Sequence, residues 1–457
     1  MNLKYRRILY LSFFAIFLAI APALIIYSTG YRYNLKKNKF EKTGILYLDS
    51  MPKGAEIYFD EKYQGQTPAR FSRLLPDQYL VEIKKNGYSF WQQKLEIKSN
   101  LTTFKRDVIL FKKNLPINII NGEINILSLV PDQEKIIYSV INRGIEELKI
   151  YNLKNQVNLD IKKFDKKNYQ QLEFISWSPN KTKMLLKMTI GSFNRYLIVD
   201  AETLKIKDLT TLTKLNFEKI KWNKNNDFFL YGLRKNALYQ IDLIANTVNL
   251  AEANVFDFEI INDQFYLISQ EKGEIYLKNK PIEDGSENDL KIIKLPKFSI
   301  YEFKDSLENF LILSDKKNND LLVIKSQIFD SADINQSIIL TDQAKKISWS
   351  KNFNQLLYFT DFEIKVLNLK SEEKELITRL SETIDDVIWH PLGSYLIYQT
   401  GNQIRALENY SSGEIKNDII LVEALKINSI FLDQNGKNLY FQGAIGQTAG
   451  IYQLEIQ

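Results

Sequence analysis

The first strong pattern along the chain is an apolar stretch close to its N-terminus. Residues 8–28 read ILYLSFFAIFLAIAPALIIYS and include no charged side chain. A helix of this length extends roughly 31 Å at about 1.5 Å per residue, which matches the hydrocarbon core of a bilayer. Pro22 interrupts the run, but membrane-spanning helices tolerate proline. The pattern predicts a single transmembrane anchor within residues 1–30, after a short cytoplasmic stub.

A cleaved signal peptide is the alternative interpretation of this stretch, because Ala21-Pro22-Ala23 has the small-x-small form of a cleavage site. The apolar run continues beyond that site to Tyr27, which favours an uncleaved anchor. Basic residues flank the run on both sides: Lys4, Arg6 and Arg7 before it, and Arg32, Lys36, Lys37, Lys39 and Lys42 after it. Charge alone therefore leaves the membrane orientation open.

A region of strand-like patterns follows a linker over residues 31–43. Five segments alternate or run apolar at strand length: ILYLD (45–49), AEIYFD (55–60), YLVEIKK (79–85), FWQQKLEIK (90–98) and FKRDVILF (104–111). Pro52 with Gly54, residues 61–66 and Asn86-Gly87 are predicted to form turns. No stretch here has a 3.6-residue period, so residues 44–112 are predicted to form a small all-β domain.

This domain resembles the PEGA family. The resemblance lies in SMPKGAEIYFD (50–60), QGQTP (64–68), LLPDQYLVEI (74–83) and KNGY (85–88), with Lys53 and Asp77 where the family usually has Glu and Gly. It implies a small β-sandwich, common on bacterial surface and envelope proteins, without catalytic residues. Tyr88 and Trp91 are interpreted as aromatic residues of its core or rim, the alternative being a platform on which a ligand stacks.

The rest of the chain carries an internal repeat in which a short strand ends in a large apolar residue, followed by a polar turn and an apolar strand. The repeated residue is Val130, Trp177, Trp222, Ile261, Phe303, Trp349, Trp389 and Phe431 in the eight units. The mean spacing, (431 − 130)/7 = 43 residues, is typical of a β-propeller blade with four antiparallel strands. Residues 113–457 are therefore predicted to form a propeller.

We predict eight blades, with seven as the alternative, because either residues 117–126 or the final strand could close the ring. The turns that begin at Trp177 (WSPN) and Trp389 (WHPLG) resemble those of TolB-like and related WD-repeat propellers. Because each clear unit has its tryptophan one position before a turn, we interpret the tryptophans as packing residues between blades. The predicted fold class is thus all-β with one N-terminal transmembrane helix.

The composition excludes several kinds of chemistry. The chain has no cysteine, which removes disulfides, thiolate metal sites and thiol nucleophiles. Its net charge of +6 comes from 61 basic and 55 acidic residues that are mixed along the sequence. Since no basic stripe interleaved with aromatic residues stands outside the membrane flanks, no nucleic-acid partner is expected.

Catalytic motifs are equally scarce. The only histidine, His390, occupies the turn position that Ser178 and Ser350 fill in other repeats, so we interpret it as a turn residue. S-x-x-K matches at 269–272 and 371–374 are assigned to polar turns, and the acidic segments 284–289 and 315–320 to solvated loops rather than calcium sites. No P-loop, nucleophile elbow or dinucleotide fingerprint is present. We nominate no catalytic, cofactor-binding or metal-binding residue and expect no cofactor.

The expected function is that of a non-catalytic protein of the cell membrane, anchored by one span, with most of the chain outside the cytoplasm. Its partners would be the membrane and an unknown protein or cell-wall glycan, bound on a propeller face built from variable loops. The alternatives are a cell-envelope hydrolase or lyase with carboxylates in the propeller channel, or an envelope-assembly partner of the TolB type. Carboxylates with perturbed pKa values around one channel pocket would favour the enzyme.

Overall fold

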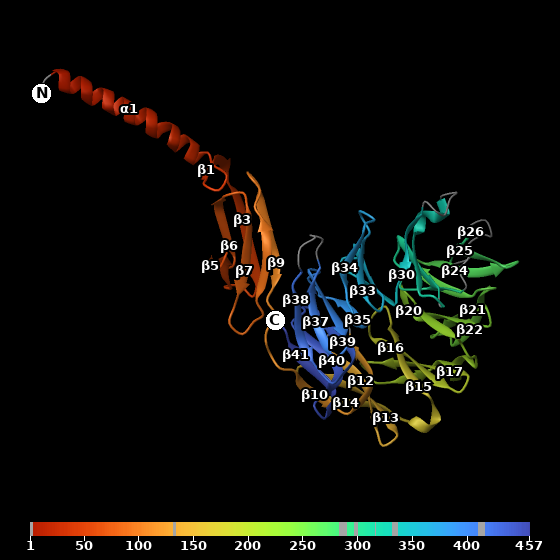
Figure 1. Cartoon of the computed structure of the whole chain (residues 1–457). Helices are drawn as coiled ribbons and strands as arrows, with labels where there is room; N and C mark the ends of the chain where they lie inside the picture. Colours follow the sequence, from red (N-terminus) through yellow and green to blue (C-terminus); the bar gives the residue numbers. More distant parts are fainter. Residues whose placement is uncertain are drawn as a thin grey trace.

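The computed structural model describes residues 3–130, 134–282, 290–296, 300–315, 317–330, 337–409 and 416–457. One long helix is followed by a small hairpin, a β-sandwich and a large ring of four-stranded sheets (Figure 1). Figure 1 shows the helix extending away from the β-structure, with the sandwich between the helix and the ring. The described part of the chain is thus nearly all-β with one N-terminal apolar helix.

The apolar N-terminal stretch forms α1 (Leu3–Ser28). Its segment Tyr5–Ser28 is long and apolar enough to cross a membrane, and none of the side chains described in it is buried. The helix ends at Ser28, shortly before Gly30. Gly30 has φ +88°, a left-handed conformation that ends helices and costs glycine little. The Arg32 guanidinium then lies 3.5 Å from the centre of the Tyr27 ring, which places a positive charge at the end of the apolar stretch.

Residues of the predicted linker form a hairpin of β1 (Tyr31–Asn34) and β2 (Lys39–Lys42). The tip of the hairpin is attached to the sandwich, because Lys36 Nζ lies 3.2 Å from Asp77 Oδ2 and Lys37 Nζ donates to the Pro76 carbonyl at 3.2 Å. The segment between helix and sandwich is therefore structured in the described chain.

The sandwich consists of two sheets that enclose one apolar core. The first sheet has the order β6 (Ala69–Leu74), β3 (Gly44–Met51), β9 (Thr102–Ile109), and β3 pairs with β9 in parallel. The second has the order β5 (Lys62–Gln66), β4 (Glu56–Phe59), β7 (Gln78–Lys84), β8 (Trp91–Glu96). Alternate residues of β3 point inward, and Leu46 and Leu48 are fully buried with Trp91.

The predicted turn over residues 61–66 is wrong. Only Asp60 and Glu61, both with positive φ, make the tight connection, and Lys62–Gln66 forms strand β5 against β4. The strand β5 lies at the edge of its sheet, and most of its side chains are in solvent. Its sequence, KYQGQ, is therefore polar and lacks the apolar pattern that predicts a strand.

The remaining described strands form eight four-stranded antiparallel sheets, seven of them built from consecutive strands. These are β11 (Glu123–Leu129), β12 (Lys135–Asn142), β13 (Ile145–Asn152), β14 (Asn158–Asp165); β15 (Gln171–Trp177), β16 (Lys183–Ile190), β17 (Phe193–Asp200), β18 (Ile206–Asp208); β19 (Lys219–Asn223), β20 (Asn226–Arg234), β21 (Ala237–Asp242), β22 (Thr247–Ala253); β23 (Asp257–Ile261), β24 (Gln264–Glu271), β25 (Glu274–Pro281), β26 (Lys291–Lys294); β27 (Tyr301–Phe303), β28 (Phe310–Asp315), β29 (Asp320–Lys325), β30 (Ile338–Gln343); β31 (Lys346–Trp349), β32 (Gln355–Phe359), β33 (Glu363–Asn368), β34 (Lys374–Arg379); and β35 (Ile384–Trp389), β36 (Tyr395–Thr400), β37 (Gln403–Glu408), β38 (Asp418–Glu423). A short helix α2 (Leu209–Thr213) follows β18, and single 3-10 turns cover Lys166–Asn168 and Ser326–Asp330.

The eighth sheet joins the two ends of the ring. Its strands β39 (Lys426–Leu432), β40 (Asn438–Ile445) and β41 (Thr448–Glu455) come from the C-terminus, and β10 (Ile117–Asn121) pairs with β41 from the other end of the region. Figure 1 shows β10 beside the C-terminal strands. Residues 117–121 therefore supply the closing strand, which is one of the two solutions that the sequence left open.

The 43-residue repeat coincides with these sheets. Seven of the eight repeated apolar residues lie within the first strand of a sheet, and Val130 directly follows the first strand β11. Among the described residues, each sheet shares a buried apolar cluster with the next, and a last cluster, including Ile124 of β11 and Ile451 of β41, closes the circle. This arrangement is propeller-like, and its cores lie between neighbouring sheets.

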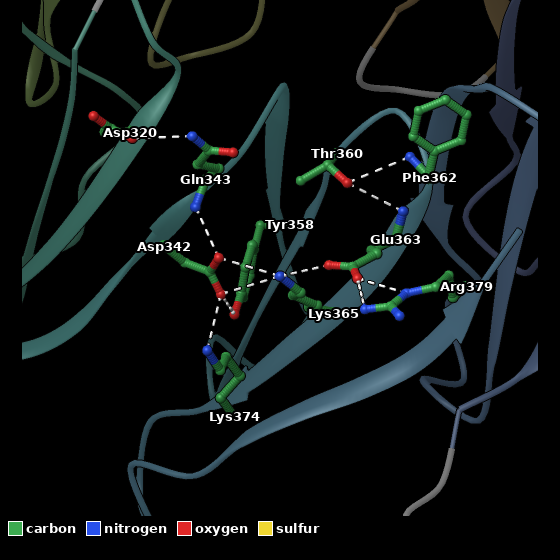
Figure 2. A network of polar contacts seen from close by, with 10 residues as sticks. All are labelled: Asp320, Asp342, Gln343, Tyr358, Thr360, Phe362, Glu363, Lys365, Lys374 and Arg379. Atoms are coloured by element: carbon green, nitrogen blue, oxygen red, sulfur yellow. Dashed lines mark hydrogen bonds and ion pairs between the residues drawn. The ribbon is translucent and has the colours of Figure 1, made fainter.

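Polar contacts also connect neighbouring sheets. Figure 2 shows Asp342 of β30 facing the next sheet, where it accepts hydrogen bonds from Lys365 at 3.1 Å, Lys374 at 3.1 Å and the Tyr358 hydroxyl at 3.1 Å. Burial raises the pKa of Asp342, but the hydrogen bonds from the Gln343 amide and the two lysines outweigh it, so that the pKa lies below its ordinary value. The carboxylate thus stays charged and holds two sheets together.

Candidate binding site

Several first strands of neighbouring sheets contact one another, such as β11 with β15, β23 with β27 and β31 with β35, which places them around the axis of the ring. Two ion pairs with the same spacing of 38 residues connect β19 and β23 there: Lys219 Nζ to Asp257 Oδ1 at 2.7 Å, and Lys221 Nζ to Glu259 Oε2 at 2.6 Å. Asp257 also accepts a hydrogen bond from the Phe303 amide of β27 at 2.7 Å. Ion pairs between sheets thus line this side of the axis.

A cavity of about 400 Å³ lies beside these pairs, where β15, β19 and β27 end. We call it the inner-strand pocket. It is lined by Ile175, Ser176, Trp177, Pro179, Ile220, Lys221, Trp222, Lys224, Glu259, Phe303, Lys304 and Asp305. Three of these twelve residues, Trp177, Trp222 and Phe303, are repeated large apolar residues of the second, third and fifth units, so residues that define the repeat also form the pocket. A concave, mostly apolar site with a few converging polar groups is the usual form of a ligand site.

The charged groups around the pocket are mostly paired with one another. Glu259 is buried, with its side chain 3% exposed, and it binds Lys221 at 2.6 Å and Lys224 at 3.5 Å. Burial raises the pKa of Glu259, but the charges of Lys221 and Lys224 outweigh it and hold the pKa below its usual range. Lys304 is ion-paired with Glu302. Each lysine of the pocket thus has a carboxylate partner, and Lys221 and Lys224 share one.

Asp305 differs from the other acidic residues. Among the described residues, its carboxyl group accepts no hydrogen bond and forms no ion pair. Burial of the carboxyl group raises the pKa of Asp305 although the residue as a whole is exposed, with Glu259 adding to the rise and Lys224 opposing it. Two carboxyl groups of opposite pKa shift, Glu259 and Asp305, therefore line the same pocket.

The tryptophans of the repeat do pack between sheets. Trp177 Nε1 donates to Ser128 Oγ at 3.3 Å, Trp349 Nε1 to the Asp305 carbonyl at 2.8 Å and Trp389 Nε1 to the Ser348 carbonyl at 3.1 Å, each on the preceding sheet. Trp222 is the exception: it is 6% exposed, and its buried Nε1 has no hydrogen-bond partner among the described residues. The exception occurs at the inner-strand pocket.

His390 lies in the predicted turn. Its amide donates to the Tyr395 carbonyl at 3.0 Å, just as Ser178 donates to Lys183 and Ser350 to Gln355 in the sister turns. The His390 ring is buried, and burial lowers its pKa to about 4, against the smaller opposing effect of the Gly436 carbonyl. The ring is therefore neutral at pH 7.

The remaining sequence motifs lie apart from the pocket. Ser269 is in strand β24 rather than a turn and is buried, so that assignment was wrong for the first S-x-x-K match, whereas Ser371 lies in a turn. Asp315 caps its own turn by accepting from the Lys317 amide at 2.7 Å. Residues 284–289 and 316 lie outside the described residues. In the described part of the chain, no group of three or more metal-ligating side chains is present.

A second polar site joins the sandwich to the ring. Trp91 Nε1 donates to Glu408 Oε1 at 2.6 Å, and Glu408 also accepts from the Asn417 side chain at 2.8 Å and the Tyr395 hydroxyl at 3.2 Å. Glu408 is 1% exposed. Phe111 continues the contact, because its ring packs edge-on against Tyr395 with ring centres 5.2 Å apart. Trp91 is thus a core residue, as predicted, and also a buried polar link between the domains.

Sequence reasoning missed both the ion pairs of the inner strands and the link of Trp91 to Glu408. The spacing of 38 residues between Lys219 and Asp257, and between Lys221 and Glu259, is a signal that a comparison of charges at equivalent repeat positions could have found. The partner of Trp91 lies 317 residues away and has no such signal.

Comparison with known proteins supports part of this picture. The PEGA domain family matches residues 43–114. Among solved structures, the chain is similar to the C-terminal WD40 domain of Sif2 (10% identity, 75% of this chain and 98% of that one, TM-score 0.47). It is also similar to a eukaryotic initiation factor (10% identity, 73% and 89%, TM-score 0.49) and to Porphyromonas gingivalis dipeptidyl peptidase 4 (11% identity, 72% and 56%, TM-score 0.46). No curated protein sequence matches the chain. Residues 43–114 thus form a PEGA domain, and the strand order of the sheets that follow it is propeller-like.

Proposed function

We propose that the protein is a single-pass, membrane-anchored binding protein of the cell surface. Helix α1 is the anchor, the PEGA domain is a spacer, and the eight sheets are the blades of a closed propeller that presents a binding face outside the cytoplasm. The buried link between Trp91 and Glu408 is the observation that carries this proposal. It joins the ring to the spacer, and the tip of the hairpin that follows the helix contacts the spacer. A protein that presents a binding face needs such a rigid support.

The absence of cysteine from the chain allows a direct test of topology. A single cysteine would replace Leu115, which is 87% exposed between spacer and ring, or Tyr5, which is 67% exposed at the other end of the helix. We expect a membrane-impermeant maleimide to label Leu115→Cys on intact cells and Tyr5→Cys only after permeabilisation. The reverse pattern would place the ring in the cytoplasm. Release of the full chain from membranes by an alkaline carbonate wash would contradict the anchor.

A hydrolase or lyase that acts in the ring is a second candidate, favoured by the opposite pKa shifts of Glu259 and Asp305 at one pocket. Two carboxyl groups with separated pKa values can act as base and acid. Release of reducing ends from cell-wall glycans, or of new amino termini from peptides, by the purified full chain would support this candidate if Asp305→Asn abolished it. Equal rates for the two chains would contradict it.

A further inference from the structure

The charges around the inner-strand pocket restrict what it can bind. Each lining ammonium group already has a carboxylate partner: Lys221 and Lys224 share Glu259, and Lys304 has Glu302. An anionic ligand would have to break one of these pairs. A cationic ligand would meet the carboxyl group of Asp305, but the ammonium groups of Lys221 and Lys224 act on the same site and oppose it. Because buried charges need partners, the pocket favours a neutral ligand.

The pocket combines apolar walls with unused hydrogen-bonding capacity. Trp177 is held in place by its bond to Ser128 on the neighbouring sheet, and Phe303 is anchored through its amide by Asp257. Between these walls, the Asp305 carboxyl group has no hydrogen bond among the described residues, and the Trp222 indole N–H lacks an acceptor there. The Trp222 N–H is itself buried, so the Asp305 carboxyl group is the one that a ligand can reach. A matching ligand therefore has one apolar face together with a hydroxyl group that donates to Asp305.

Sugar rings have this chemistry. The axial C–H groups of a pyranose form an apolar face that packs on an indole, while its hydroxyl groups lie at the ring edge, where they can bond to a carboxyl group. A ring of this size fits within a cavity of about 400 Å³. An apolar peptide side chain would use the apolar walls but would leave the Asp305 carboxyl group without a hydrogen-bond donor.

We propose that the inner-strand pocket binds a neutral sugar residue of a glycan, which stacks on Trp177 and donates a hydroxyl hydrogen bond to Asp305. This inference rests on the proposed function, because it names the ligand of the binding face. It is independent of membrane orientation, since the pocket is formed within the ring alone.

The test uses the full chain in detergent micelles, titrated calorimetrically with neutral tetrasaccharides of N-acetylglucosamine and of glucose. A uronic-acid tetrasaccharide and a neutral aromatic tripeptide serve as alternative ligands. We expect saturable binding of a neutral tetrasaccharide, and we expect Asp305→Ala and Trp177→Leu each to weaken it roughly tenfold, because each removes a contact of ordinary hydrogen-bond or stacking strength. Trp389→Leu is the matched control, since Trp389 has the equivalent position in a sheet away from the pocket.

Three results would overturn the inference: no tetrasaccharide binding at millimolar concentration, binding that neither pocket substitution weakens, or tighter binding of the charged sugar or the tripeptide. Asp305 is exposed, so its replacement by alanine does not require the fold to adjust. Sugar binding by a chain that the maleimide test places in the cytoplasm would refute the proposed surface function and leave the pocket assignment standing. Surface labelling without sugar binding would support the proposed surface location and refute the assignment of the pocket to a sugar.

Discussion

His390 shows how a single turn residue makes the stability of this protein depend on pH. In the folded chain its Nδ1 accepts from the Leu392 amide at 3.4 Å, and its Nε2 lies 3.3 Å from the Gly436 carbonyl. Protonation would turn Nδ1 into a donor that faces another donor. This geometry agrees with a pKa of about 4 in the folded chain, against an ordinary value of 6.5.

The consequence is a loss of stability in mild acid. Because folding lowers the pKa of His390, its contribution is fully present above pH 6.5 and is lost as the pH falls through 6.5 toward 4. We expect protonation of His390 to lower the free energy of unfolding, measured with urea, by about 2 kcal/mol between pH 7 and pH 5. Since His390 is the only histidine, His390→Gln should remove this part of the pH dependence. An unchanged pH dependence in that variant would contradict the assignment.

At the scale of the element, closure of the ring depends on the fit between β10 and β41. Gly450 of β41 lies so close to β10 that a Cβ atom on it would be 2.0 Å from the Ile120 carbonyl oxygen. A backbone atom cannot yield as the end of a side chain does. Gly450→Ala should therefore displace β10 and destabilise the chain by about 2 kcal/mol.

Thermal unfolding and limited proteolysis would measure this effect. We expect a lower Tm for Gly450→Ala and new cleavage within residues 113–122. Gly446→Ala is the control for backbone strain without crowding, because Gly446 lies in the same hairpin, has φ +58°, which disfavours alanine, and has no atom within 4 Å of its added Cβ. If the two variants have the same Tm and neither is cleaved near β10, crowding against β10 does not explain the loss of stability in Gly450→Ala.

The network in Figure 2 permits a prediction about contacts between sheets. Replacing Asp342 by asparagine removes the charge that binds Lys365 and Lys374, and we expect a loss of about 1–2 kcal/mol at pH 7. Because the folded pKa of Asp342 is lowered, this contribution is present above its ordinary pKa and is lost as the pH falls below it. The difference between Asp342→Asn and the original chain should therefore shrink in acid.

Urea titrations at neutral and acidic pH would show this convergence. Asp320→Asn is the control from the same network, since Asp320 accepts only a long bond of 3.3 Å from the Gln343 side chain there. A difference between Asp342→Asn and the original chain that stays constant with pH would show that the carboxylate charge contributes nothing.

At the scale of the whole molecule, local patterns predicted the parts but not how they join. Spacing alone located the first strand of each sheet, because a large residue such as Trp222 must recur wherever a sheet packs on the next. The closing strand β10 stayed ambiguous, since its partner β41 is more than 300 positions away and only the completed ring brings them together. The inner-strand pocket was also missed, because Asp305 and Glu259 have no motif and become neighbours only through the curvature of the ring.

The junction of spacer and ring leads to the last prediction. Glu408→Ala should leave the Trp91 indole N–H without its buried acceptor and remove the 3.2 Å hydrogen bond of the Tyr395 hydroxyl, which keeps a 3.5 Å bond to the Ile109 carbonyl. Leaving a buried donor without its acceptor typically costs about 1–3 kcal/mol. Because the network lies between the sandwich and the ring, we expect these two domains to separate while the core of each stays folded.

Small-angle X-ray scattering of the full chain in micelles would detect undocking as an increased maximum dimension, and faster cleavage within residues 112–116 would accompany it. Glu455→Ala is the matched control, because the Glu455 carboxylate binds Lys112 at 2.8 Å near the same junction but is 50% exposed. Water screens such a pair, so its loss should change little. If both variants keep the original dimensions, the apolar contact of Phe111 with Tyr395 is enough to hold the domains together, and the ring is positioned by packing rather than by the buried carboxylate.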